Sequence, residues 1–145
     1  NFLQQQHDLV QGNDQIGVIA LADVDHFKRI NDSHSHAVGD QVLERVAHIL
    51  RDGCRKTDFV ARYGGEEFLL YLPCTDTEQA LDVCGQLRLA VQDAEWSDLA
   101  DGLAVTISFG LAEIAGMSLY KSVLDEADTR LYRAKNAGRN RVIAA

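Results

Sequence analysis

The sequence predicts an α/β sandwich, in which helices cover a central mixed and largely antiparallel sheet. Short apolar runs rich in β-branched residues alternate with longer segments whose apolar residues recur at helical spacing. A glycine pair joins two strand-like runs in the middle of the chain, which is typical of a hairpin and therefore of antiparallel pairing. The 145 residues, 46% of them hydrophobic, are enough for one compact domain with one core.

The first third of the chain predicts a helix end, a buried strand and a complete helix. Residues 2–10 have the pattern of the tail of an amphipathic helix, which ends at the turn-forming residues 12–14. Residues 16–24, IGVIALADV, form a continuous apolar run and predict a buried central strand. Residues 38–52 carry apolar side chains at helical spacing, and Gly53 is a suitable residue to end that helix.

The rest of the chain predicts a hairpin followed by further helices and strands. The strand-like runs at 58–63 and 67–73 flank Gly64 and Gly65, so we expect the hairpin tip at these glycines. The later predicted elements are a helix over 76–94, a strand over 103–114, a helix over 118–136 and a short strand over 141–145. The order is β-α-β-β-α-β-α-β, which predicts that the hairpin lies beside the end of the first strand.

Composition excludes several classes of function. A net charge of -8 argues against a protein that binds nucleic-acid grooves, because such proteins display basic patches. The sequence has neither an apolar run of about 20 residues nor a signal-peptide pattern, so we expect no membrane contact by this segment. Its three cysteines are odd in number and lack CxxC spacing, which predicts a cytoplasmic protein without a disulfide framework.

Two acidic clusters are the first candidates for chemistry. Asp23 and Asp25 come at the end of the predicted buried strand, and Glu66 and Glu67 lie at the hairpin tip. If strand and hairpin meet, these carboxylates surround one cleft, and such a site suits Mg²⁺ together with substrate phosphates. The alternative is that they are solvated acids in loops.

Two other features also allow a simple structural explanation. The glycine pair could serve only to permit positive φ in the hairpin, or its missing side chains could let a nucleotide approach the backbone. Three histidines, His26, His34 and His36, lie near one another, but they lack the fuller ligand set of a structural zinc site.

Several motifs occur together in one order along the chain. They are DVDHFKRIND at 23–32, GD at 39–40, RYGGEEF at 62–68, TISFG at 106–110 and ADTRLYRAKNAGRNRV at 127–142. This pattern resembles the GGDEF domain of diguanylate cyclases, with a GGEEF signature, over nearly the whole chain. The resemblance implies a nucleotide-cyclase or palm-like fold over residues 1–145 and an enzyme that joins two GTP into cyclic di-GMP.

The family's usual lead-in motif, DxLTGLxNR, is not present. We therefore expect the chain to be a C-terminal fragment of a larger sensor protein, whose upstream segment could carry a membrane anchor.

The resemblance assigns metal and catalytic roles to residues of the acidic clusters. It implies that the side chains of Asp23 and Glu66 and the carbonyl of Val24 bind Mg²⁺, with Mn²⁺ as an alternative. It also makes Glu66 the general base toward the attacking 3′-hydroxyl and Glu67 a supporting acid. Lys28 is the implied lysine that contacts phosphate and stabilises charge in the transition state.

The resemblance also implies a GTP site. Its residues are Asn31, His36, Asp40, Gly64, Gly65, Lys135 and Arg139. Asn31 and Asp40 read the guanine edge, because a carboxylate accepts from N1-H and N2-H, and adenine lacks this donor pair. His36 lies near the sugar, and its alternative is an exposed loop histidine. Lys135 and Arg139 hold the β and γ phosphates.

The same resemblance predicts partners and regulation. Each domain binds one GTP, so catalysis requires a homodimer in which two domains face each other. Arg55 and Asp58 form an RxxD motif at the spacing of the family's inhibitory cyclic di-GMP site, although an ordinary surface ion pair is the alternative. Arg88 is a weaker candidate for contact with this product.

Two other classes of function compete with a cyclase. The first is a binding module that senses GTP or cyclic di-GMP without turnover, and the second is an interaction domain without a ligand. The intact set of Asp23, Glu66 and Lys28 favours catalysis.

Overall fold

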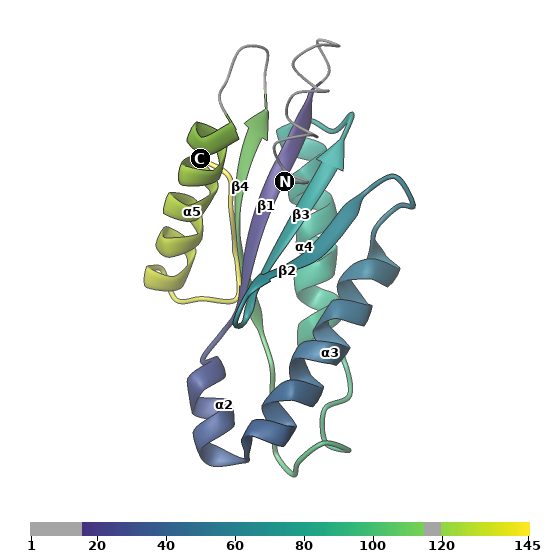
Figure 1. Ribbon diagram of the computed structural model, residues 1–145, viewed down its shortest axis with the longest axis vertical. Helices are drawn as coiled ribbons and strands as arrows, with labels where there is room; N and C mark the ends of the chain where they lie inside the picture. Colours follow the sequence, from purple (N-terminus) through teal and green to yellow (C-terminus); the bar gives the residue numbers. More distant parts are fainter. Residues whose placement is uncertain (1–15, 115–119) are drawn as a thin grey trace.

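A five-stranded sheet with helices on both faces forms the molecule, of which this computed structural model describes residues 16–114 and 120–145 (Figure 1). The elements are β1 (Gly17–Val24), α2 (Phe27–Ser33), α3 (His36–Gly53), β2 (Phe59–Gly64), β3 (Glu67–Pro73), α4 (Thr77–Asp93), β4 (Ile107–Ile114), α5 (Tyr120–Asn136) and β5 (Val142–Ile143). The strand order is β2-β3-β1-β4-β5, and of these neighbours β4 and β5 pair in parallel. The predicted mixed and largely antiparallel sheet is therefore confirmed.

The central strand β1 is buried on both faces, which explains its continuous apolar sequence. Val18, Ala20 and Ala22 belong to the larger core, beneath α3 and α4. Ile19 and Leu21 point to the other face, where they join the smaller core beneath α5. The sheet is thus the middle of three layers, and successive residues of β1 pack alternately against the helices on its two faces.

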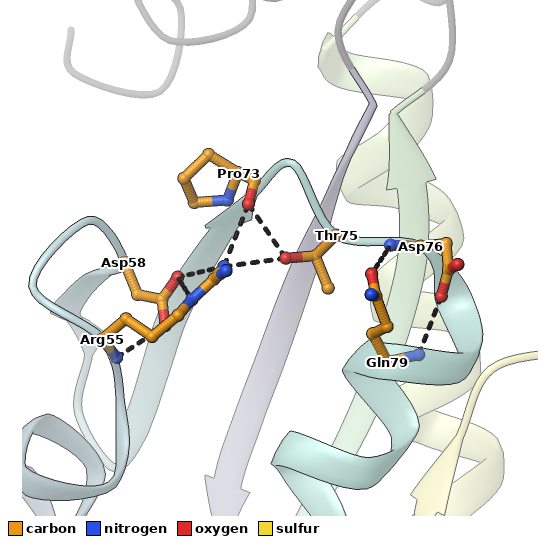
Figure 2. Close-up of polar contacts among 6 residues, drawn as sticks. All are labelled: Arg55, Asp58, Pro73, Thr75, Asp76 and Gln79. Carbon is orange, nitrogen blue, oxygen red and sulfur yellow. Dashed lines mark hydrogen bonds and ion pairs between the residues drawn. The ribbon is translucent and has the colours of Figure 1, made fainter.

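The helix boundaries follow from local side-chain contacts. Asp76 and Gln79 form a reciprocal capping box at the start of α4, in which Gln79 N donates to Asp76 Oδ1 at 2.8 Å (Figure 2). The prediction that Gly53 ends the preceding helix is off by one residue, because α3 includes Gly53 and its C-cap is Cys54. A Cβ on Gly53 would lie 2.3 Å from Leu87 Cδ2, so this glycine permits close packing of α3 on α4.

One helix was not predicted, and two other predicted boundaries differ from the structure. The short helix α2 was not predicted, since its seven residues bury only Ile30 and show no helical apolar pattern. The strand expected over 103–114 begins at Ile107, and the final strand is limited to Val142–Ile143. The helix expected over residues 2–10 lies outside the described residues.

The hairpin of β2 and β3 lies beside the end of β1, as predicted. Asp23 pairs with Glu67 in the register between β1 and β3, and Val24 N donates to Glu66 O at 3.2 Å. Gly65 has a φ of 45°, which a glycine adopts readily at the turn. This arrangement sets the two acidic clusters next to each other. None of the helices within the described ranges is long and apolar enough to cross a membrane.

Candidate active site

A pocket of about 500 Å³ opens where β1 ends, between the hairpin tip, α2 and the end of α5. The residues that line it are Asp23, Val24, Asp25, His26, Phe27, Lys28, Arg29, Asp32, Glu66, Lys135 and Arg139. The predicted metal ligands and all three predicted phosphate-binding cations therefore share one cavity, although they come from three separate parts of the sequence.

Asp23 is one of two buried acids that line this pocket, and its side chain is 5% exposed. The ammonium group of Lys135 donates to its Oδ2. Burial raises the pKa of Asp23 to about 6; Lys135 opposes this rise, and the nearby Glu66 and Glu67 add to it. The three carboxylates therefore lie within electrostatic reach of one another, and the pocket favours a bound cation.

The available oxygen atoms fit a hard divalent ion that also binds substrate. Asp23 and Glu66 offer carboxylates, and the backbone of Val24 lies against that of Glu66. Within residues 16–114 and 120–145, no group of three or more His, Cys, Asp or Glu side chains could hold a metal alone. The donor set is therefore of the kind that Mg²⁺ uses when phosphates complete its coordination.

The positive side of the pocket is formed by side chains from α2 and from the loop after α5. Lys28 is exposed on α2, and Arg139 is half-buried in the loop. The pKa of His26 is lowered by desolvation and by the positive charges of Arg29 and Arg139, so these groups lie near one another. A polyanion such as a triphosphate would meet cations on one side and the acidic cluster on the other.

Glu67 lies at the edge of the acidic cluster rather than among the residues lining the pocket. Burial raises its pKa, Lys135 opposes this rise, and Asp128 and Glu66 add to it. The hairpin glycines Gly64 and Gly65 are exposed, and a Cβ on either would meet nothing within 4 Å. The backbone at the tip is therefore open to an approaching ligand.

The predicted guanine-binding residues lie on α2 and α3, outside the lining of this pocket. Asn31 Oδ1 is buried and has no hydrogen-bond partner in the part of the chain that the structure describes. It lies against Gly39, where a Cβ would come within 1.8 Å of it. Asp40 and His36 are exposed, and Asp40 lines a neighbouring hollow of about 340 Å³. An unsatisfied buried acceptor that lies against Gly39, the residue before the exposed Asp40, suits a ligand with several N–H donors.

A larger hollow of about 810 Å³ lies on the other face of the sheet, between β2, β3 and α5. Its walls include Leu21, Leu69 and Leu124, and it contains none of the predicted site residues. Among the described residues, Lys121 is the one cation in its lining, whereas the smaller pocket combines several cations with the acidic cluster. Because phosphoryl chemistry depends on neutralising negative charge, we place the candidate active site in the smaller pocket.

The RxxD motif occupies the loop between α3 and β2, at the end of β2 remote from the hairpin tip. Asp58 has a side chain that is 1% exposed and accepts from both the backbone N and the guanidinium of Arg55 (Figure 2). Arg55 Nη2 also donates to Pro73 O at 3.0 Å and to Thr75 Oγ1 at 2.8 Å. The structure thus brings Arg55 and Asp58 together. Arg88 instead donates to Asn140 Oδ1 and Gln92 Oε1.

Sequence reasoning grouped Asp25 with Asp23, but the structure gives the two acids different partners. Asp25 accepts hydrogen bonds from Thr106, Ser108 and Asn140. The sequence feature that could have indicated this difference is Ser108, which is fully buried in β4; apart from the exposed Glu113, the other residues of this strand are apolar or glycine.

Comparisons with known proteins agree with this geometry. The family model "Diguanylate cyclase, GGDEF domain" matches residues 1–141. The chain is 41% identical over 128 residues to diguanylate cyclase DgcP of Pseudomonas aeruginosa, covering 88% of this chain but 19% of that protein's length.

Two solved structures show the same similarity. The GGDEF domain of DgcB from Caulobacter crescentus, in complex with c-di-GMP, matches with a TM-score of 0.92 and 34% identity, over 99% of this chain and 85% of that one. The active GGEEF domain of a diguanylate cyclase from Vibrio cholerae matches with a TM-score of 0.91 and 26% identity, over 99% and 91% of the two chains.

Proposed function

Because the chain belongs to the GGDEF domain family of diguanylate cyclases, we propose that it condenses two GTP into cyclic di-GMP and releases two pyrophosphates. The observation that carries this proposal is the pocket in which Asp23 and Glu66 face Lys28, Lys135 and Arg139. Phosphoryl transfer depends mainly on positioning and on charge neutralisation, and this set of side chains supplies both.

Asp23, Glu66 and the carbonyl of Val24 would hold Mg²⁺ or Mn²⁺ in this proposal. When bound, the ion supplies positive charge that neutralises the phosphate oxygens as the bond to the leaving group breaks. In the metal-free protein, the ammonium of Lys135 provides the positive charge beside Asp23. Lys135 is then free to bind the β and γ phosphates once another cation balances Asp23.

The remaining roles are assigned to residues in the pocket or at its edge. Glu66 is half-buried at the hairpin tip, and we assign it the proton of the attacking 3′-hydroxyl. Glu67 supports it through the shared acidic field. Lys28 and Arg139 neutralise charge that develops on the phosphates.

The base specificity is proposed to come from Asn31 and Asp40, with His36 near the sugar. The unsatisfied Oδ1 of Asn31 and the carboxylate of Asp40 are acceptors, and guanine presents two adjacent donors, N1-H and N2-H. Adenine would leave one acceptor buried without a partner, which is costly.

Gly39→Ala tests this assignment. The new Cβ would displace Asn31 Oδ1, so we expect the affinity for GTP to fall about tenfold while that for ATP stays at its low level. Titration with each nucleotide measures the ratio. Gly85→Ala is the matched control, because this helical glycine has no atom within 4 Å of its Cβ position. Equal GTP affinity in Gly39→Ala and wild type would contradict the assignment.

The homodimer and the product site belong to the same proposal. One pocket holds one GTP, so two domains must face each other for each 3′-hydroxyl to reach the other substrate. The Caulobacter relative forms a complex with c-di-GMP. We propose that Arg55 and Asp58 bind this product and inhibit the enzyme.

Arg55→Ala is expected to relieve product inhibition, raising the inhibitory concentration of cyclic di-GMP about tenfold or more, because arginine binds phosphate through paired hydrogen bonds. Initial rates of pyrophosphate release with added product measure the effect. Arg51→Ala removes the same charge from the last turn of α3 and should leave inhibition unchanged. Equal inhibition of Arg55→Ala and wild type would remove the product site from the proposal.

The first experiment is chromatography of GTP after incubation with Mg²⁺ and either the concentrated protein or an artificially dimerised form. Cyclic di-GMP with pyrophosphate would support the cyclase. Tight binding of a guanine nucleotide without product in both forms would instead indicate a sensor module.

A further inference from the structure

Asp25 is held by three neutral donors. Its Oδ1 accepts from Ser108 Oγ at 2.7 Å, and its Oδ2 accepts from Thr106 Oγ1 at 2.7 Å and from Asn140 N at 2.9 Å. The residue is 5% exposed, and none of the ion pairs among the described residues includes it. Its carboxylate therefore binds backbone and hydroxyl groups from two other segments of the chain.

One of these segments is the loop after α5, whose backbone has an unfavourable conformation. Arg139 has a φ of 63° and Asn140 a φ of 48°, so two consecutive non-glycine residues are left-handed. This conformation is disfavoured for L-residues and persists only where neighbours impose it. The peptide N–H that joins the two residues is shared between Asp25 Oδ2 and Ser108 Oγ, at 2.9 and 3.0 Å.

A second set of contacts fixes the loop from its outer side. Asn140 Oδ1 accepts from Arg88 Nη1 at 3.0 Å, and Asn140 Nδ2 donates to Gln92 Oε1 at 2.7 Å, so α4 braces the same residue. Arg139 N donates to Ala134 O at 2.9 Å at the end of α5. The orientation of the Arg139–Asn140 peptide sets ψ of Arg139, and the N–H of this peptide is bound on its inner side by Asp25 and Ser108.

We propose that Asp25 is a positioning residue, which holds the loop after α5 so that Arg139 is presented to the pocket. The ligand in this inference, a nucleoside triphosphate, rests on the proposed function, whereas the contact between Asp25 and the loop does not. Asp25 also borders the pocket, so the competing role is that of a metal ligand. The two roles predict different behaviour for an uncharged isostere.

Two variants at position 25 separate these roles. Asp25→Asn keeps an acceptor oxygen for Asn140 N and can donate to Ser108 Oγ, whereas Asp25→Ala removes every side-chain contact of residue 25. By NMR, amide hydrogen exchange at Asn140 should be about tenfold or more faster in Asp25→Ala, and close to wild type in Asp25→Asn. Thr106→Val is the control, because it removes one donor to Asp25 and leaves the bond to Asn140 intact.

The second readout is binding of a GTP analogue with a methylene group between the α and β phosphorus atoms, compared with binding of GMP. Asp25→Ala should lose about tenfold in affinity for the analogue and retain its affinity for GMP, because only the analogue carries the phosphates that Arg139 binds. Asp25→Asn should resemble wild type in both titrations. If Asp25→Ala does not fold, Asp25→Ser replaces it.

Unchanged exchange at Asn140 in Asp25→Ala would overturn the inference. So would an Asp25→Asn protein that loses metal-dependent binding as completely as Asp25→Ala, since that result would assign Asp25 to the metal. If wild type binds no guanine nucleotide, the proposed function fails, and the exchange measurement still decides whether Asp25 holds the loop.

Discussion

Asp23→Asn is expected to abolish product formation and, at the same time, to make the metal-free protein more stable. Loss of the charged ligand should lower turnover roughly a thousandfold, because the ion would no longer be held against the phosphates. The gain in stability has another origin. Burial disfavours the charged form of Asp23, so the neutral amide should stabilise the fold by about 1 to 2 kcal/mol at pH 7.5.

The pH dependence of the stability gained by Asp23→Asn tests whether burial of the charged carboxylate is its cause. The pKa of Asp23 is about 6 in the folded protein and 3.8 without the protein environment, so the native state binds the proton more tightly. Wild type therefore loses stability as pH rises through this interval, whereas the variant has no such group. The difference in the free energy of unfolding between Asp23→Asn and wild type should grow between about pH 4 and pH 6 and stay constant at higher pH. Urea unfolding in chelator at several pH values measures it.

Glu66→Ala is the control for this experiment. It should also abolish turnover, but its side chain is only half-buried, so we expect no comparable gain in stability. Added Mg²⁺ should raise the unfolding temperature of wild type and of neither variant, because a ligand stabilises only the state that binds it. An Asp23→Asn protein that retains turnover, or that is less stable than wild type, would contradict the assignment.

Gly110→Ala is expected to destabilise the fold by about 3 kcal/mol or more. A Cβ at this position of β4 would lie 2.2 Å from both Ala127 O and Leu131 N. These are backbone atoms of α5, so the clash can be relieved only by moving the helix from the sheet. Since α5 carries Lys135, the movement would also separate this lysine from Asp23. Unfolding in urea measures the loss.

Gly85→Ala provides the matched comparison, because the chemical change is the same and no atom lies within 4 Å of the new Cβ. In this helical position alanine should stabilise the protein by about 0.5 to 1 kcal/mol. If the two variants were equally stable, close packing of β4 against α5 would not be the reason for a glycine at 110.

The elements that were predicted well are those whose burial leaves a long pattern in the sequence. β1 is apolar throughout because both of its faces are covered, and the glycine pair marks the hairpin that brings Glu66 to Asp23. The helix α2 leaves no such pattern, since only Ile30 of its seven residues is buried.

The different roles of Asp23 and Asp25 could not be predicted from spacing. Two acids that are two residues apart look equivalent in a motif, but their partners come from distant segments of the chain. Asp23 contacts Lys135, whereas Asp25 contacts Thr106, Ser108 and Asn140. Likewise, nothing near Gly53 in the sequence indicates that Leu87 packs against it. Such contacts depend on the complete fold.

The contact between Arg55 and Asp58 has a consequence for the proposed product inhibition. In the free protein each residue is already the other's partner, so a ligand that engages both must first open this pair. The apparent dissociation constant then equals the intrinsic constant divided by the fraction of molecules in which the pair is open. If Arg55 and Asp58 bind the product as proposed, a more stable pair raises the concentration of cyclic di-GMP at which inhibition begins, without altering any contact to the ligand. Pro73 and Thr75, which also accept from Arg55, would then help to set this threshold.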